Sequence, residues 1–204
     1  MIKTVLHMYS SPLFYEETDF KLTDKEKEYV LNVEYRRPKG FNNHSNMSTH
    51  TFLLEAPELK RVREYFDKKV KEYTDEILEI ENEFYMTQSW STINYTGYNH
   101  PTHNHPNAIL SLVYYVDCES GEFYTDRLTQ QGYNFNYKVK KYNIHNSPRW
   151  KMPVKSQDIL IFPAWLPHGS TINNSDKDRL VIGSNYFVRG IMGNEQEGSI
   201  LEIK

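Results

Sequence analysis

The residues of this chain best suited to chemistry are two closely spaced histidines. His103 and His105 stand two positions apart in "HPTHNHPNAILSLVYYVD", and alternate residues of an extended segment point to the same side. Two neighbouring imidazoles have the spacing that adjacent ligands of one metal ion require. They precede an apolar run that is typical of a buried strand. The pattern therefore predicts a metal site, against the simpler interpretation of two surface histidines.

A third ligand must come from elsewhere, and His168 is the best candidate. It follows the apolar run "DILIFPAWLP", so a strand and a proline-bounded turn would deliver it at a strand end. If the two strands are neighbours, three nitrogens meet on one side of an ion. The other side stays open for substrate and oxygen, as in non-haem iron oxygenases. The remaining histidines have no such context, and we interpret them as surface or turn residues: His7, His44, His50, His100 and His145.

An arginine is the next candidate. Arg179 comes eleven positions after His168 and begins the apolar run "RLVIGSNYFV". Its guanidinium could point into the same cavity and bind a carboxylate through two parallel hydrogen bonds. Taken alone, the residue is better explained by a surface ion pair to Asp176 or Asp178.

One long helix and many short strands must position these residues. Residues 56–80 carry apolar side chains at steps of three and four, which predicts an amphipathic helix. From residue 87 to 189, short β-branched and aromatic runs alternate with turn sequences, which is typical of a sandwich or barrel. Further strands are expected near 2–9 and in "YNFNYKV". We expect one domain over 1–204, with residues 1–55 as an N-terminal extension.

Composition narrows the class of protein. The chain has 204 residues, a net charge of −3 and a single cysteine, Cys118. Nothing argues for nucleic-acid binding, an internal disulfide, a secretory signal or a membrane span, so a cytoplasmic globular protein is the expectation. An edge strand could pair two copies into a homodimer, although no residue requires it.

Taken together, the motifs resemble a known superfamily. A His-x-His pair, a "VYYV" strand, an "FPAWLPH" turn and an arginine about ten residues later are similar to the Fe(II)- and 2-oxoglutarate-dependent oxygenases. The likeness extends from about Leu59 to Phe187 and is strongest to the prolyl-hydroxylase branch and to a bacterial and phage group. It implies a double-stranded β-helix, or jelly roll, that is mostly β with supporting helices. It also implies Fe(II), 2-oxoglutarate and O2, and hydroxylation of a small molecule or protein side chain with release of succinate.

The resemblance also assigns roles to residues. His103 and His168 match iron ligands, whereas His105 stands where most members have Asp or Glu. Arg179 matches the arginine that pairs with the distal carboxylate of 2-oxoglutarate, and Tyr115 matches a tyrosine that often bonds to the same group.

Three further positions are weaker matches or depart from the pattern. Tyr95 matches a tyrosine near the keto-acid end of the cosubstrate, and Asn185 falls on the strand of the arginine. Val181 stands where many relatives have a serine.

Two alternatives remain open at this stage. A cupin-type metalloenzyme would use three histidines without 2-oxoglutarate, and a non-catalytic jelly-roll domain would hold a structural metal. Three histidines also suit Zn(II) or Mn(II). The substrate would be selected by loops such as 41–50 and the locally basic 136–151.

Overall fold

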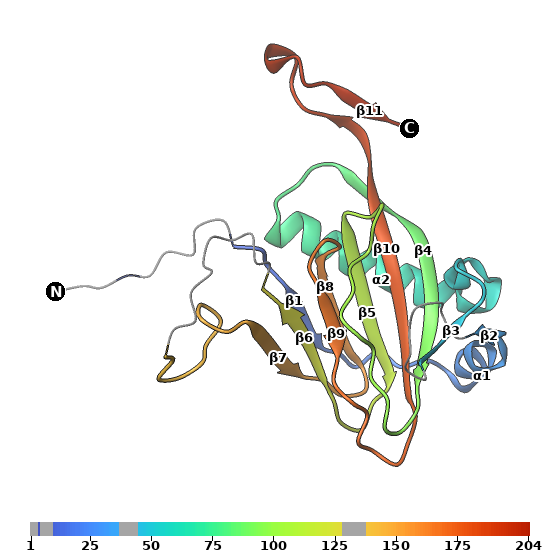
Figure 1. Cartoon of the computed structure of the whole chain (residues 1–204). Helices are drawn as coiled ribbons and strands as arrows, with labels where there is room; N and C mark the ends of the chain where they lie inside the picture. Colours follow the sequence, from blue (N-terminus) through green and yellow to red (C-terminus); the bar gives the residue numbers. More distant parts are fainter. Residues whose placement is uncertain (1–3, 5–9, 37–44, 128–137) are drawn as a thin grey trace.

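The computed structural model of the chain describes residues 4, 10–36, 45–127 and 138–204, and its largest element is an antiparallel sheet. The order of this major sheet is β1-β8-β5-β10-β4-β3-β2, with β11 pairing the far end of β10. Its strands are β1 (Phe14–Glu17), β2 (Tyr35–Arg36), β3 (Ser45–Ser48), β4 (Glu83–Asn94), β5 (Leu110–Asp117), β8 (Asp158–Pro163), β10 (Arg179–Met192) and β11 (Leu201–Ile203). Figure 1 shows β10 and β11 projecting from the body as a long hairpin.

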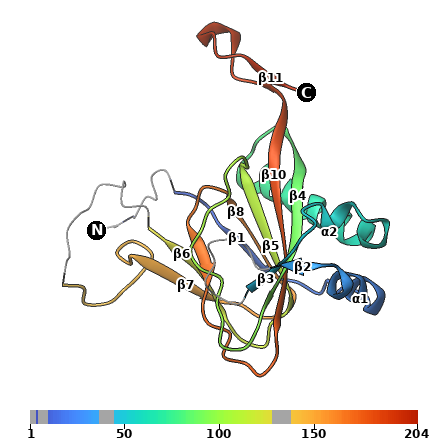
Figure 2. The ribbon, with the colours of Figure 1, turned by 45° about the vertical axis from the view of Figure 1, so that its right-hand side comes forward.

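A second, minor sheet faces one side of the first. Its order is β7-β6-β9, formed by β7 (Arg149–Pro153), β6 (Glu122–Asp126) and β9 (His168–Ser170). Apolar side chains of both sheets, including Tyr115 on β5 and Phe123 on β6, form a common buried cluster. The two facing sheets (Figure 2) make the predicted double-stranded β-helix, or jelly roll.

Helices cover the opposite face of the major sheet. The helix expected over 56–80 is shorter than predicted, because only α2 (Lys60–Glu72) is α-helical. A 3-10 turn (Pro57–Leu59) precedes it and a π-helical turn (Tyr73–Ile77) follows it. The apolar side of α2 is buried in one cluster with residues of β5, β8 and β10 that point away from the minor sheet. This packing stabilises the major sheet on its helical face.

Described strands of the N-terminal extension pair with the major sheet. β1 pairs with β8 and β3 pairs with β4, both antiparallel. Between them, α1 (Asp24–Asn32) begins with a capping box in which the Thr23 and Glu26 side chains bond each other's backbone N–H. A further 3-10 turn (Leu53–Glu55) precedes α2, and another (Glu195–Glu197) lies in the terminal hairpin.

Two predicted strands fall largely outside the described residues. These are the strand near 2–9 and the "YNFNYKV" strand, of which only residues 4, 138 and 139 are described, none of them in a strand. Within the described part of the chain, no helix is long and apolar enough to cross a membrane.

Candidate active site

Three histidines come together between the two sheets. His103 and His105 lie in the connection from β4 to β5 rather than in a regular strand, and His168 begins β9. His103 and His168 nevertheless pair as an isolated antiparallel bridge, with N–H···O distances of 2.9 Å in both directions. The backbone N–H of His105 donates to the carbonyl of Ala164 at 2.9 Å. These bonds hold an otherwise irregular segment against the His168 turn.

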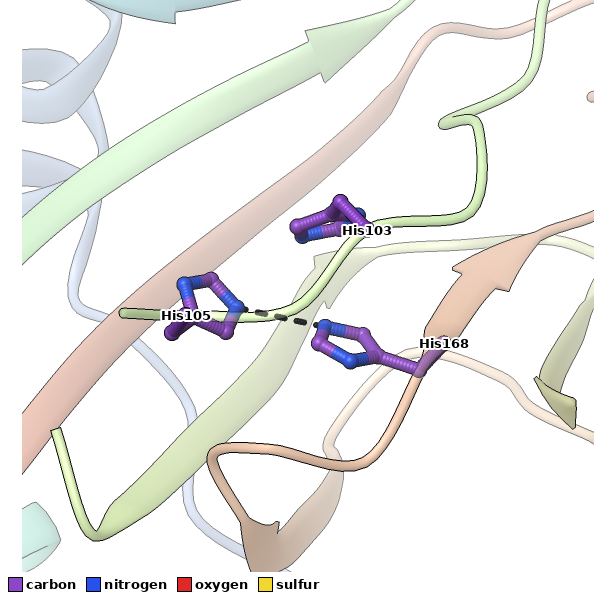
Figure 3. Close-up of side chains that lie close together, drawn as sticks. All are labelled: His103, His105 and His168. Atoms are coloured by element: carbon purple, nitrogen blue, oxygen red, sulfur yellow. Dashed lines mark hydrogen bonds between the residues drawn. The ribbon is translucent and has the colours of Figure 1, made fainter. Parts of the chain in front are cut away.

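The three imidazoles are arranged as a metal site would require. One ring nitrogen of each lies within 4.8 Å of those of the other two. The Nε2 atoms of His105 and His168 are 3.2 Å apart (Figure 3). In the described part of the chain this is the single cluster of at least three such ligand groups.

The neighbouring carbonyl groups fix the tautomers of two ligands. His103 Nδ1 lies 2.9 Å from the carbonyl oxygen of Pro101, and His168 Nδ1 lies 2.8 Å from that of Leu166. Since a carbonyl oxygen only accepts, both Nδ1 atoms carry the proton, and the Nε2 lone pairs are left for a cation. Three nitrogen donors of this kind fit Fe(II), Zn(II) or Mn(II).

Burial keeps these imidazoles neutral. It lowers the pKa of His103, and it lowers the pKa of His168 well below the usual range. For His105, burial and then the neighbouring imidazoles His103 and His100 lower the pKa to about 3. Neutral imidazole is the form that binds metal, so no proton needs to leave before a cation binds at neutral pH.

Arg179 lies in the same cavity and is 1% exposed. Its Nη1 donates to the carbonyl of Thr171 at 3.1 Å and its Nη2 to that of Ser120 at 3.3 Å. Its Nε is buried without a hydrogen-bond partner, and within the described residues no carboxylate forms an ion pair with it. The alternative of a surface pair with Asp176 or Asp178 is therefore wrong. A buried guanidinium in this state favours binding of an anion.

The cavity wall is mainly aromatic and apolar. The sheet register places Thr92, Val181 and Tyr115 side by side on β4, β10 and β5. All three line the cavity, together with the aromatic rings of Trp90, Phe123 and Phe162. Burial raises the pKa of the Tyr115 hydroxyl and outweighs the opposing effect of the Arg179 charge, so the hydroxyl stays protonated and can donate a hydrogen bond.

Two predicted cosubstrate residues lie outside this wall. The Tyr95 hydroxyl accepts a hydrogen bond from Asn46 Nδ2 at 3.1 Å. Asn185 is buried beside the cavity, where its Oδ1 accepts from Ser111 Oγ at 2.8 Å and its Nδ2 donates to Gln88 Oε1 at 3.1 Å. Of these residues, Ser111 lines the cavity.

One cavity residue was misinterpreted from the sequence, and the position of a second residue, Trp90, depends on the adjacent strand. His100, interpreted there as a surface or turn residue, lies in a loop but lines the cavity, with its ring 4.5 Å from that of His103. Trp90 lies across Gly183, where a Cβ would be 2.6 Å from the indole, and its ring centroid is 5.3 Å from that of His105.

The comparisons with known proteins agree with this geometry. Residues 88–185 match the family described as "Putative 2OG-Fe(II) oxygenase". This range contains all three histidines, Arg179 and Tyr115. No curated protein sequence matches the chain.

Several solved structures share the fold at low sequence identity. HygX from Streptomyces hygroscopicus, with nickel, 2-oxoglutarate and hygromycin B bound, is 12% identical with a TM-score of 0.59, over 86% of this chain and 82% of that one. The carbocyclase SnoK from nogalamycin biosynthesis is 12% identical (TM-score 0.61, 86% and 80% covered). A Pseudomonas putida prolyl-4-hydroxylase is 10% identical (TM-score 0.56, 89% and 95% covered).

Proposed function

We propose that this chain, whose β core matches the 2OG-Fe(II) oxygenases in sequence and whose fold is theirs, is an Fe(II)- and 2-oxoglutarate-dependent oxygenase that hydroxylates its substrate. One observation carries the proposal: a three-histidine cluster lines one aromatic cavity together with a buried arginine that has no counter-ion among the described residues. A cation site and an anion site in the same enclosed space suit a metal and a dicarboxylate bound together.

The polar side chains of the cavity would each bind the metal or the cosubstrate. His103, His105 and His168 would hold the iron through neutral nitrogens. Arg179 would bind the distal carboxylate of 2-oxoglutarate, because its Nε is the buried donor that still lacks an acceptor. The protonated hydroxyl of Tyr115 would donate to the same carboxylate. When bound, Fe(II), 2-oxoglutarate and O2 supply the oxidising chemistry, in which succinate and CO2 are released.

The remaining wall excludes water and orients the substrate. Phe123 and Phe162 pack beside His168, with ring centroids 5.6 and 4.5 Å from its imidazole. Such walls shield a reactive centre from solvent. Tyr95 and Asn185, which lie outside the cavity wall, would act through their neighbours, with Asn185 orienting the hydroxyl of Ser111.

The substrate would approach along the inner face of β4. Gln88 is exposed and lies on this face two residues from Trp90, in a hydrogen-bonded row with Asn185 and Ser111. The row is uncharged and leads to the cavity, so it suits a neutral polar group of a small molecule or a protein side chain. The hygromycin B bound to HygX supports the small-molecule alternative.

Replacement of the family's carboxylate ligand by His105 has an electrostatic consequence. Three neutral imidazoles leave the full charge of a divalent ion uncompensated by the protein. The dianion 2-oxoglutarate would therefore be held by the ion as well as by Arg179. A three-histidine enzyme that needs no keto acid is the competing function, and it gives Arg179 no role.

An anaerobic titration tests the proposal. Purified protein receives Fe(II) and then 2-oxoglutarate, and the weak visible charge-transfer band of the chelate is recorded. We expect a band that is absent in His168→Ala and that needs far more 2-oxoglutarate in Arg179→Ala. Metal binding without any band would instead favour the three-histidine enzyme without a keto acid.

A further inference from the structure

We propose that Asp126 and Arg149 are positioning residues that lock together the two chain segments carrying His103 and His168, and thereby set the metal affinity of the site. The inference depends on the proposed function in one respect, namely that these histidines bind a metal. Arg149 belongs to the locally basic stretch that sequence analysis treated as a substrate loop.

Asp126 contacts the residue before each of the two ligands. Its backbone N–H donates to the carbonyl of Pro167 at 2.9 Å, directly before His168. Its Oδ2 accepts from the Thr102 hydroxyl at 3.0 Å, directly before His103. One residue at the end of β6 therefore bridges both segments.

Arg149 holds the Asp126 carboxylate in the orientation that this contact needs. Its Nε donates to Oδ1 at 2.6 Å and its Nη2 to Oδ2 at 2.8 Å, which is a bidentate pair. The same Nη2 donates to Thr102 Oγ1 at 3.2 Å, and the guanidinium carbon lies 3.8 Å from the ring centroid of Tyr124. The Tyr124 hydroxyl is also 3.0 Å from Thr102 Oγ1. The Thr102 hydroxyl is therefore held by the side chains of Asp126, Arg149 and Tyr124.

The His103 segment needs such support. It is an irregular connection, tied to the His168 turn by the bridge between these histidines and by the bond from His105 to Ala164. Freedom left in the segment would have to be lost when a metal binds, and this would weaken binding. Groups that orient metal ligands typically change metal affinity by about 10–100-fold when removed.

The chain contains a matched control on the same two strands. Lys151 and Glu122 form an ion pair across β7 and β6 at 3.0 Å. Lys151 lies two residues from Arg149 and Glu122 lies four residues from Asp126, so each is on the same face of the minor sheet as its counterpart. The Glu122 and Lys151 side chains make no hydrogen bond to the histidine-bearing segments in the described structure. Glu122→Gln therefore removes a similar surface pair without touching the ligands.

The experiment measures Co(II) binding by visible absorption and calorimetry, which needs neither iron nor turnover. We expect Asp126→Ala to weaken Co(II) binding by about 10–100-fold, whereas Glu122→Gln leaves it unchanged. Arg149→Lys keeps the charge but loses the bidentate geometry, so it should give a smaller loss. It also serves as the second variant if Asp126→Ala fails to fold.

Several outcomes would overturn the inference. Affinity unchanged in both Asp126→Ala and Arg149→Lys would do so, as would an equal loss in Glu122→Gln. If the unmodified protein binds no Co(II), the metal site itself is wrong. If the affinities follow expectation but 2-oxoglutarate gives no band with Fe(II), the positioning role stands and the proposed oxygenase function fails.

Discussion

Gly121 lies against the guanidinium of Arg179 so closely that a Cβ built on it would be 2.6 Å from Nη2 and 2.9 Å from Cζ. The arginine is buried, and the open space beside its guanidinium is the cavity itself, so a displaced guanidinium would change the cavity. The absence of a side chain at position 121 is therefore a condition for the observed position of the guanidinium.

Gly121→Ala should consequently weaken 2-oxoglutarate binding without altering the metal ligands. We expect the concentration of 2-oxoglutarate that half-saturates the charge-transfer band to rise about tenfold, which corresponds to about 1.4 kcal/mol. Co(II) affinity should stay within error of the unmodified protein. An unchanged 2-oxoglutarate requirement would show that Arg179 does not bind the cosubstrate in this orientation.

The two outer histidines of the loop provide a direct contrast. His105→Ala removes a predicted ligand and should weaken Co(II) binding about 100-fold or more, because only two of the three imidazole ligands are left to bind the ion. His100→Ala removes a ring that also lines the cavity but lies outside the ligand cluster, and it should leave Co(II) affinity nearly unchanged. Calorimetric titration of both variants with Co(II) identifies the ligands. A larger loss of affinity in His100→Ala than in His105→Ala would contradict the assignment of His105 as a ligand.

The packing of α2 on the sheet predicts a large loss of stability on truncation. Phe66 is 0% exposed, and its ring contacts Tyr114 edge-on at 5.8 Å between centroids. Phe66→Ala should lower the free energy of unfolding by about 3–5 kcal/mol. Phe52, which is 44% exposed, is the control, and Phe52→Ala should cost less than about 1 kcal/mol. Urea unfolding monitored by tryptophan fluorescence measures both, and equal losses would argue against this core.

The capping box of α1 predicts a pH-dependent contribution to stability. Burial raises the pKa of Glu26, but the bonds from Arg61 and Thr23 outweigh it, so the net pKa lies below the usual 4.5. Arg61 bonds both carboxylate oxygens, at 2.9 and 2.6 Å. Since the folded-state pKa is the lower one, the stabilisation is complete above pH 4.5 and is lost as the pH falls through the folded-state value.

Glu26→Gln isolates this contribution. We expect the variant to be about 1 kcal/mol less stable than the unmodified protein at pH 7. The gap should close as the pH falls from 4.5 through the lower folded-state pKa of Glu26, below which the unmodified carboxyl is itself protonated. Urea unfolding at several pH values provides the measurement, and a gap independent of pH would rule out the ion pair as its cause.

Sequence reasoning predicted the features that depend on local periodicity. The spacing of His103 and His105, the strand end before His168 and the apolar run after Arg179 are all local signals, and the structure brings these four residues to one cavity. The two-sheet architecture followed from the regular spacing of short aromatic strands.

Features that depend on long-range contacts were not predictable in this way. His100 enters the cavity because its loop bonds to Ser170, seventy positions away. The contact between Asp126 and Arg149 joins residues 23 positions apart, and no local pattern indicates that these two side chains pair. The end of α2 was misplaced because the apolar periodicity continues through Tyr73, whereas the backbone changes there to π-helical bonding.

The uncompensated charge of Arg179 has a consequence for how long the protein survives, separate from catalysis. A carboxylate that enters the cavity binds the folded chain and not the unfolded one, so each tenfold rise in its concentration above the dissociation constant adds about 1.4 kcal/mol to the free energy of unfolding. The resistance of the chain to heat and proteolysis thus follows the supply of its own cosubstrate. When 2-oxoglutarate is scarce, we therefore expect both a lower amount of folded protein and a lower turnover rate.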